Sequence, residues 1–173
     1  ARKEADRMAG KERDIKVHIE NVKKTYMGRT GEVVALNGVN LDIKDNEFVT
    51  VVGPSGCGKS TLLNILAGLL EPTSGVITCN GKPIKGTGPE RGVVFQQYAL
   101  FPWLTVLKNV MFPLNMKGIK GEEAEKIARK YIKMVDLEKF ENHYPKELSG
   151  GMKQRVAIAS AYAANPEVLL MDE

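Results

Sequence analysis

The sequence contains no apolar run close to the roughly 18 residues that a helix needs to cross a bilayer. Its two cysteines, Cys57 and Cys79, have no metal-ligand spacing, and both are expected to be free thiols. Aromatic residues make up only 6% of the chain, which argues against the stacking platform of proteins that bind single-stranded nucleic acid. Lys and Arg are spread along the chain. The net charge of +4 is compatible with two interpretations, an anionic partner or a solvated surface of mixed charge.

The 173 residues are enough for one domain with its own core, and their 43% hydrophobic and 27% charged composition is ordinary for a globular protein. The first 14 residues are densely charged and lack the apolar stretch of a signal peptide. We expect them to form a flexible tail, and we expect a cytoplasmic protein. His18 and His143 are expected to be solvated.

Apolar periodicity and turn residues predict alternating strands and helices. Strands are expected near 15–22, 33–43, 48–52, 76–79, 92–95 and 168–171, and helices near 59–70, 105–114, 122–135 and 151–164. Turns are expected at Asn37–Gly38, inside the second strand, and at Asn80–Gly81, which with the strand 76–79 predicts a hairpin. The segment 48–52 is short, apolar and β-branched, which is typical of a buried parallel strand. The pattern predicts an α/β fold with a mainly parallel sheet, an early β-rich portion and a helical insertion.

The segment 53–60 matches the phosphate-binding pattern G-x-x-x-x-G-K-[ST] in every position, between an expected strand and an expected helix. Glycines let the backbone N–H groups approach a triphosphate closely, and the helix N-terminus adds positive potential. Lys59 would contact the β- and γ-phosphates, and Ser60 would bind Mg²⁺. The residues expected to hold the nucleotide here are Gly53, Pro54, Ser55, Gly56, Cys57, Gly58, Lys59, Ser60 and Thr61.

The apolar segment 168–171 is followed by two carboxylates, Asp172 and Glu173. Ligands of parallel sheets gather at the carboxyl ends of the strands, so Asp172 is expected to bind Mg²⁺ near Lys59 and Ser60. Glu173 could orient or deprotonate an attacking water.

The string 148–155, Leu-Ser-Gly-Gly-Met-Lys-Gln-Arg, begins the Ala-rich helix. It places Ser149 and two glycines at the helix N-terminus, which fits either an ordinary helix cap or an anion site. It resembles the signature motif of ATP-binding cassette (ABC) ATPases, and it lies between the phosphate loop and the acidic strand end as in that family. Gln96 matches the family's Q-loop glutamine, and Tyr26 matches the aromatic residue that stacks on adenine. The resemblance implies a RecA-like P-loop core with an antiparallel β subdomain and a helical signature subdomain at about 97–151, within a nucleotide-binding domain over 15–173.

The resemblance also implies a head-to-tail dimer in which each Mg-ATP lies between one chain's phosphate loop and the partner's signature motif. Ser149, Gly150 and Gly151 would then contact ATP bound to the other chain. Gln96 would contact Mg²⁺ and the lytic water, so Lys59, Gln96 and Glu173 are the expected catalytic residues.

The segment 98–106 resembles the part of importer ATPases that contacts a membrane subunit, and its Pro-Trp-Leu-Thr form is most similar to nitrate, taurine and sulfonate uptake ATPases. The resemblance implies a transport ATPase on the inner face of the cell membrane, with separate permease subunits, an indirectly linked solute-binding protein and no nucleic-acid partner. A soluble ABC protein acting on ribosomes or DNA, and a nucleotide-binding module without hydrolysis, remain alternatives.

Members of this family continue past the acidic strand with a D-loop and a switch histidine, whereas this sequence ends at Glu173. We therefore expect the chain to be a fragment or truncated product of a longer protein, and hydrolysis to depend on the missing part.

Overall fold

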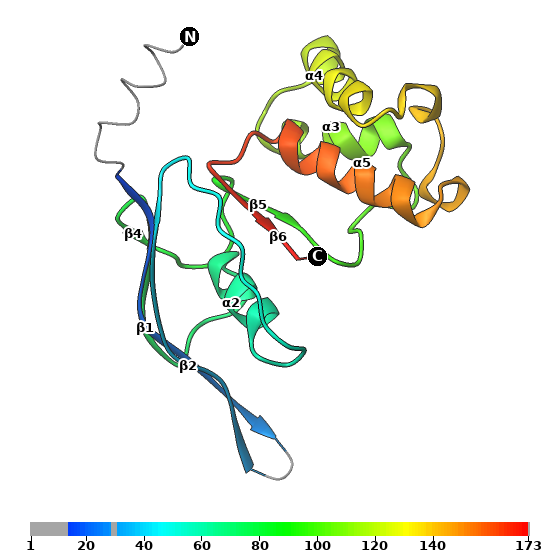
Figure 1. The fold of residues 1–173 in the computed structure, drawn as a ribbon. Coiled ribbons are helices and arrows are strands. Elements are labelled where there is room, and N and C mark those ends of the chain that lie inside the picture. Colours follow the sequence, from blue (N-terminus) through cyan, green and yellow to red (C-terminus); the bar gives the residue numbers. More distant parts are fainter. Residues whose placement is uncertain (1–13, 29–30, 173) are drawn as a thin grey trace, which may run out of the picture. The chain divides into compact units, whose positions relative to one another are not determined.

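The computed structural model describes residues 14–28 and 31–172, and it divides the chain into two compact units (Figure 1). Unit 1 extends to Gly86 and unit 2 begins at Thr87. Most of the segment 1–14, for which a flexible tail is expected, lies outside the described residues. Among the described helices, none is both long enough and apolar enough to cross a membrane.

Unit 1 is built on a four-stranded antiparallel sheet in the order β2-β1-β3-β4 (Figure 1). Its strands are β1 (Ile15–Gly28), β2 (Gly31–Lys44), β3 (Ser74–Cys79) and β4 (Lys82–Pro83). Of the apolar residues that predict the first strand, Val17, Ile19 and Val22 are buried and Ile15 is 48% exposed. Ile77 and Cys79 of β3 are buried too. Asn80 and Gly81 both have positive φ (50° and 71°), which suits a two-residue hairpin turn and confirms the predicted hairpin.

The turn expected at Asn37–Gly38 is wrong, because β2 continues through both residues. Lys23 pairs with Asn37 and Val22 pairs with Val39, so Gly38 is the extra residue of a register shift. Its φ of 78° is the left-handed conformation that glycine adopts easily at a β-bulge. The Asn-Gly pair therefore changes the register of the strand and does not reverse the chain.

The strand expected at 48–52 is also wrong. The segment is irregular, and Phe48 and Val52 are 92% and 87% exposed. A strand is stabilised by hydrogen bonds to a neighbour, and within the described residues the pairs are β1–β2, β1–β3, β3–β4 and β5–β6. Apolar β-branched composition alone does not supply that neighbour.

Helix α2 (Lys59–Leu66) is shorter than the predicted 59–70. Gly68 has φ 75°, its N–H donates to Ile65 O (3.0 Å), and the N–H of Leu69 donates to Asn64 O (2.9 Å). These bonds form a glycine-terminated helix end. The buried face is Leu62, Ile65 and Leu66, whereas Leu69, expected on that face, is exposed.

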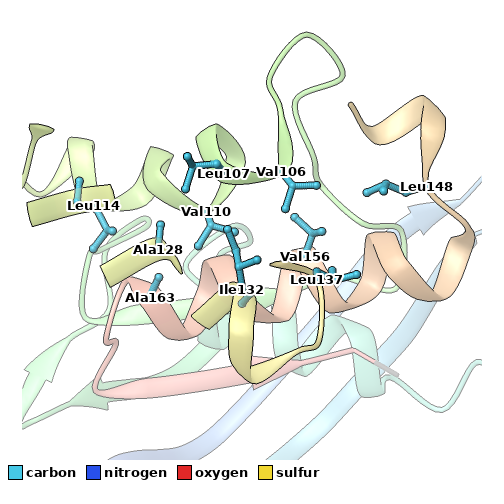
Figure 2. Packing of buried hydrophobic residues seen from close by; sticks show 12 residues of the cluster. Val106, Leu107, Val110, Leu114, Ala128, Ile132, Leu137, Leu148, Val156 and Ala163 are labelled. Carbon is cyan, nitrogen blue, oxygen red and sulfur yellow. The ribbon is translucent and has the colours of Figure 1, made fainter. Parts of the chain in front are cut away.

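Unit 2 contains a parallel strand pair, β5 (Arg91–Val94) and β6 (Val168–Met171), and a helical cluster. The helices are α3 (Val106–Met116), α4 (Gly121–Met134) and α5 (Gly150–Ala163), with short 3₁₀ turns η1 (Glu138–Phe140) and η2 (Pro145–Glu147). Their core shows the predicted helical spacing, since Val106, Val110 and Leu114 all point into it (Figure 2). The cluster also includes Leu107, Ala124, Ala128, Ile132, Leu137, Leu148, Val156, Ala159 and Ala163.

His143 differs from the expected solvated histidine. Its Nδ1 is buried without a hydrogen-bond partner, and its ring contacts Phe140 edge-on at 5.2 Å between centroids. Cys57 is exposed and Cys79 is buried, and no disulfide joins them.

His18 gives unit 1 a pH-dependent contact. Its Nδ1 lies 2.5 Å from Asp42 Oδ1 on the neighbouring strand, and this hydrogen bond raises the pKa of His18 above its usual 6.5. A raised folded-state pKa means that the stabilisation is complete below about pH 6.5 and is lost as pH rises through the folded pKa. Urea unfolding of the native chain and of His18→Gln should therefore give a stability difference that is larger at about pH 5.5 than at about pH 8.5. An equal difference at both pH values would contradict the ion pair.

Candidate functional site

The phosphate-loop residues all lie in unit 1, in the turn that follows the irregular segment 48–52 and in the first turn of α2. Gly56 and Gly58 have φ values of 80° and 96°. A Cβ on Gly58 would lie 2.4 Å from Ala35 O, and one on Gly53 would lie 2.6 Å from Cys57 Sγ. The clash at Gly58 is with backbone and its φ is positive, so the loop depends on glycine there, whereas a side chain at position 53 would require the Cys57 side chain to move.

Lys59 lies at the start of α2 and its side chain folds back across the loop. Its Nζ donates hydrogen bonds to Gly53 O (2.8 Å) and Pro54 O (2.9 Å), and it lies 4.0 Å from Cys57 Sγ. The ammonium group is thus held beside the backbone of the loop. A compact cation in this place can meet an anion that the loop encloses.

The N-terminus of α2 is well suited to an anion. Its N-cap is Gly58, which has no side chain to accept hydrogen bonds from the first-turn N–H groups. No acidic residue occurs in the first turn of this fully described helix. Ser60 and Thr61 follow Lys59 in that turn, and Ser60 is exposed. These residues bring backbone donors, a hydroxyl group and a positive helix end together.

Tyr26, the expected adenine-stacking residue, lies in β1 opposite Val33. Its ring is half-exposed, and Lys24 Nζ lies 5.4 Å from the ring centroid. The same Nζ donates to Glu71 O at 2.8 Å. An exposed aromatic face supported by a lysine can stack on a planar base.

In unit 2, the strand pair brings Gln96 and Asp172 to the same edge. Val94 of β5 pairs with Met171 of β6 in parallel, and the Asp172 N–H donates to Val94 O at 2.9 Å. Gln96 follows two residues after β5 ends. Both side chains therefore leave from the carboxyl ends of parallel strands, where ligands of such sheets bind. Glu173 lies outside the described residues.

Ser149, Gly150 and Gly151 form the N-terminus of α5. The Ser149 hydroxyl accepts a hydrogen bond from the N–H of Met152 (3.3 Å), so Ser149 is the N-cap. The first turn of α5 carries no acidic side chain, and no described atom lies within 4 Å of a Cβ placed on Gly151. Arg155 donates to Val135 O (2.8 Å) and so ties α5 to the end of α4.

Asn109 is a residue of this region that the sequence analysis missed. It is 3% exposed, and its side chain bonds the backbone of the loop that contains Trp103. Its Oδ1 accepts from Phe101 N (2.8 Å), and its Nδ2 donates to Phe101 O (3.2 Å), Leu104 O (2.9 Å) and Thr105 O (3.0 Å). A signal was available, because Asn109 is a polar residue at a core-facing position of an apolar helix.

The expected site residues therefore form three groups. The phosphate loop and Tyr26 belong to unit 1, and the carboxyl edge of β5 and β6 and the N-terminus of α5 belong to unit 2. Within the described residues, no cluster of three or more His, Cys, Asp or Glu side chains could bind a metal ion alone.

The chain is similar in sequence to ATP-binding proteins. A protein-family model described as "ABC transporter" matches residues 36–173. An uncharacterized ABC transporter ATP-binding protein of Methanocaldococcus jannaschii is 55% identical over 99% of this chain and 62% of its own length. The nitrate import ATP-binding protein NrtD of Synechocystis is 50% identical over 91% of this chain and 59% of its own length. The chain thus spans about three fifths of the length of these curated relatives.

The fold is also similar to a solved structure, that of the ATP-binding cassette MJ0796 in a dimeric post-hydrolysis state bound to ADP and Pi. The TM-score is 0.84 at 44% sequence identity, and the match covers 91% of this chain and 73% of the other.

Proposed function

The chain belongs to the ABC transporter family of ATP-binding proteins, and we propose that it is the Mg-ATP-binding part of a subunit that hydrolyses ATP to drive transport. The phosphate loop carries this proposal. A glycine at position 58 without room for a side chain, a lysine folded across the loop and an uncapped helix N-terminus match the shape and charge of a triphosphate.

We propose that the nucleotide binds together with a magnesium ion. Mg²⁺ prefers oxygen ligands, and the Ser60 hydroxyl and the Asp172 carboxylate are such ligands. When bound, the ion would neutralise charge on the phosphate oxygens. We propose that Gln96 orients the attacking water and that Glu173 accepts its proton.

We propose that the complete site forms between two copies of the chain, with Ser149, Gly150 and Gly151 of one copy facing the nucleotide of the other. The open space at Gly151 and the uncompensated positive end of α5 support this arrangement. The related cassette MJ0796 is dimeric with ADP and Pi bound.

We further propose that the subunit lies on the inner face of the membrane and powers import through separate permease subunits, to which a solute-binding protein delivers cargo. Relatives carry names for nitrate import and taurine import. Trp103 is 70% exposed. The centroid of the Phe101 ring lies 5.5 Å from that of Trp103 and 4.4 Å from that of Phe112. An exposed aromatic group on a braced loop suits the centre of a protein interface.

ATP turnover by the full-length protein across a range of protein concentrations tests the central proposal. Activity that rises faster than linearly would support a site shared by two copies. Absence of Mg-ATP binding at any concentration would contradict the proposal. Strictly linear activity would reject the paired site and retain ATP hydrolysis.

The proposed permease interface predicts that Trp103→Ala leaves Mg-ATP binding and fold stability nearly unchanged, because the side chain is mostly exposed. If Trp103 is an interface hot spot, its removal should cost about 2 kcal/mol of binding free energy, which corresponds to about 30-fold weaker assembly with the permease. Co-purification and permease-stimulated turnover measure this effect. Met116→Ala is the matched control, because Met116 is 74% exposed in the same unit and lies outside the aromatic group. Equal effects of both variants would reject the interface.

A further inference from the structure

Tyr98 contacts the first turn of α5 from the loop that follows Gln96. Its hydroxyl oxygen lies 3.1 Å from the point that a Cβ on Gly150 would occupy. Lys153 Nζ lies 5.9 Å from the centroid of the Tyr98 ring. Two residues after Gln96, the chain is thus packed directly on the N-terminus of α5.

The charges at this end of the helix explain why an aromatic ring is useful there. Lys153 lies near the positive end of α5, where a cation is unfavourable, and the first turn provides no acidic residue to offset it. The negative face of an aromatic ring attracts an ammonium group within about 6 Å. The Tyr98 ring therefore stabilises a lysine that would otherwise oppose the helix dipole.

The steric contact acts on the same turn. A Cβ contact of 3.1 Å is tighter than side chains normally show, so glycine at position 150 leaves room for the Tyr98 hydroxyl. At the next position, a Cβ on Gly151 would meet no described atom within 4 Å. Tyr98 thus packs against one glycine of the pair and leaves the other open.

We propose that Tyr98 is a positioning residue that holds the Ser149–Gly151 end of α5 in place relative to the segment after Gln96. The inference rests on the proposed function, in which this helix end meets the nucleotide of a second copy. If the segment around Gln96 is displaced, the Tyr98 ring would then displace the Ser149–Gly151 helix end, which faces the nucleotide of the second copy.

The test uses the full-length protein with Tyr98→Ala, Tyr98→Phe and the control Tyr162→Ala. Tyr162 is a suitable control because it lies near the other end of α5 and is 48% exposed, against 40% for Tyr98. Three quantities are measured for each: Mg-ATP affinity of the single chain, the protein concentration needed for ATP-dependent dimerisation, and hydrogen exchange of the first-turn amides of α5.

Tyr98→Ala should leave Mg-ATP affinity of the single chain unchanged, raise the concentration needed for dimerisation about tenfold, and speed exchange in the first turn. Tyr98→Phe should behave nearly as the native protein, because it keeps the ring. Gly150→Ala should impair dimerisation, and adding Tyr98→Phe should restore part of it by removing the hydroxyl that the new methyl group meets.

If Tyr98→Ala matches Tyr162→Ala in both dimerisation and exchange, the positioning role is wrong. If the native protein binds Mg-ATP and does not dimerise, the paired site of the proposed function is wrong. Exchange then decides for Tyr98 alone: faster exchange only in Tyr98→Ala supports the contact, and equal exchange overturns it.

Discussion

Lys59→Met should lower the Mg-ATP affinity of the full-length protein by about 100-fold or more. Hydrogen bonds to charged groups contribute about 1.5–3 kcal/mol each, and Lys59 is expected to meet two phosphate groups. Methionine keeps the length of the side chain and removes its charge, so the variant separates charge from packing. Calorimetric titration with Mg-ATP measures the affinity directly.

Two controls make this result specific. Lys82→Ala removes an exposed lysine from β4 in the same unit and should leave affinity unchanged, which accounts for the general effect of net charge. Thermal unfolding of Lys59→Met should remain close to native, because the described side-chain hydrogen bonds of Lys59 all stay within its own loop, to Gly53 O, Pro54 O and Cys57 Sγ. Native affinity in Lys59→Met would show that the loop does not hold the phosphates.

Asn109→Leu should destabilise the protein by about 2–4 kcal/mol, the largest loss of stability that we expect from one uncharged substitution in unit 2. Leucine is similar in size and can make none of the four side-chain hydrogen bonds of Asn109. The Phe101 N–H would lose its acceptor, and three backbone carbonyl groups would lose a donor. Urea unfolding measures the free energy of unfolding.

The position of the loop gives a second measurement. Trp103 is the single tryptophan of this chain, and it lies between residues whose backbone Asn109 binds. In Asn109→Leu, the fluorescence emission of Trp103 should change at urea concentrations well below those at which the whole protein unfolds. Asn115→Leu is the matched control, because Asn115 is an exposed asparagine on the same helix and should change neither quantity. Equal losses in both variants would show that helix propensity, and not the buried network, causes the effect.

The sequence predicted those parts of the fold that depend on local interactions. The Asn80–Gly81 turn, the glycines of the phosphate loop and the Ser149 cap each follow from the conformational or hydrogen-bonding needs of a few adjacent residues. The family resemblance added the order of the motifs. The fold class and the family are confirmed by the matches to known proteins, whereas the roles of individual site residues stay predictions.

The predictions that failed depended on distant partners. Segment 48–52 has the composition of a buried strand, but a strand also needs a neighbour that local composition does not specify. Asn37–Gly38 carries a turn signal that β1 overrides by pairing on both sides of Gly38. The early end of α2 could have been predicted from the sequence, because a glycine such as Gly68 commonly ends a helix. The role of Asn109 could not be predicted from the sequence. Its polar side chain at a core position indicates that it needs hydrogen-bond partners, but it does not indicate which carbonyl groups those partners are.

The strand order of unit 1 has a consequence during synthesis on the ribosome. β1 lies between β2 and β3, yet β3 begins about 30 residues after β2 ends, and the phosphate loop lies in that interval. At about 5–20 residues per second, one edge of β1 waits about 2–6 s for its partner after the β1–β2 hairpin is complete. An open strand edge invites pairing with a foreign strand. The growing chain is therefore most open to pairing with a foreign strand while the segment that contains the phosphate loop is being synthesised. Rapid pairing of β3 with β1 closes that edge.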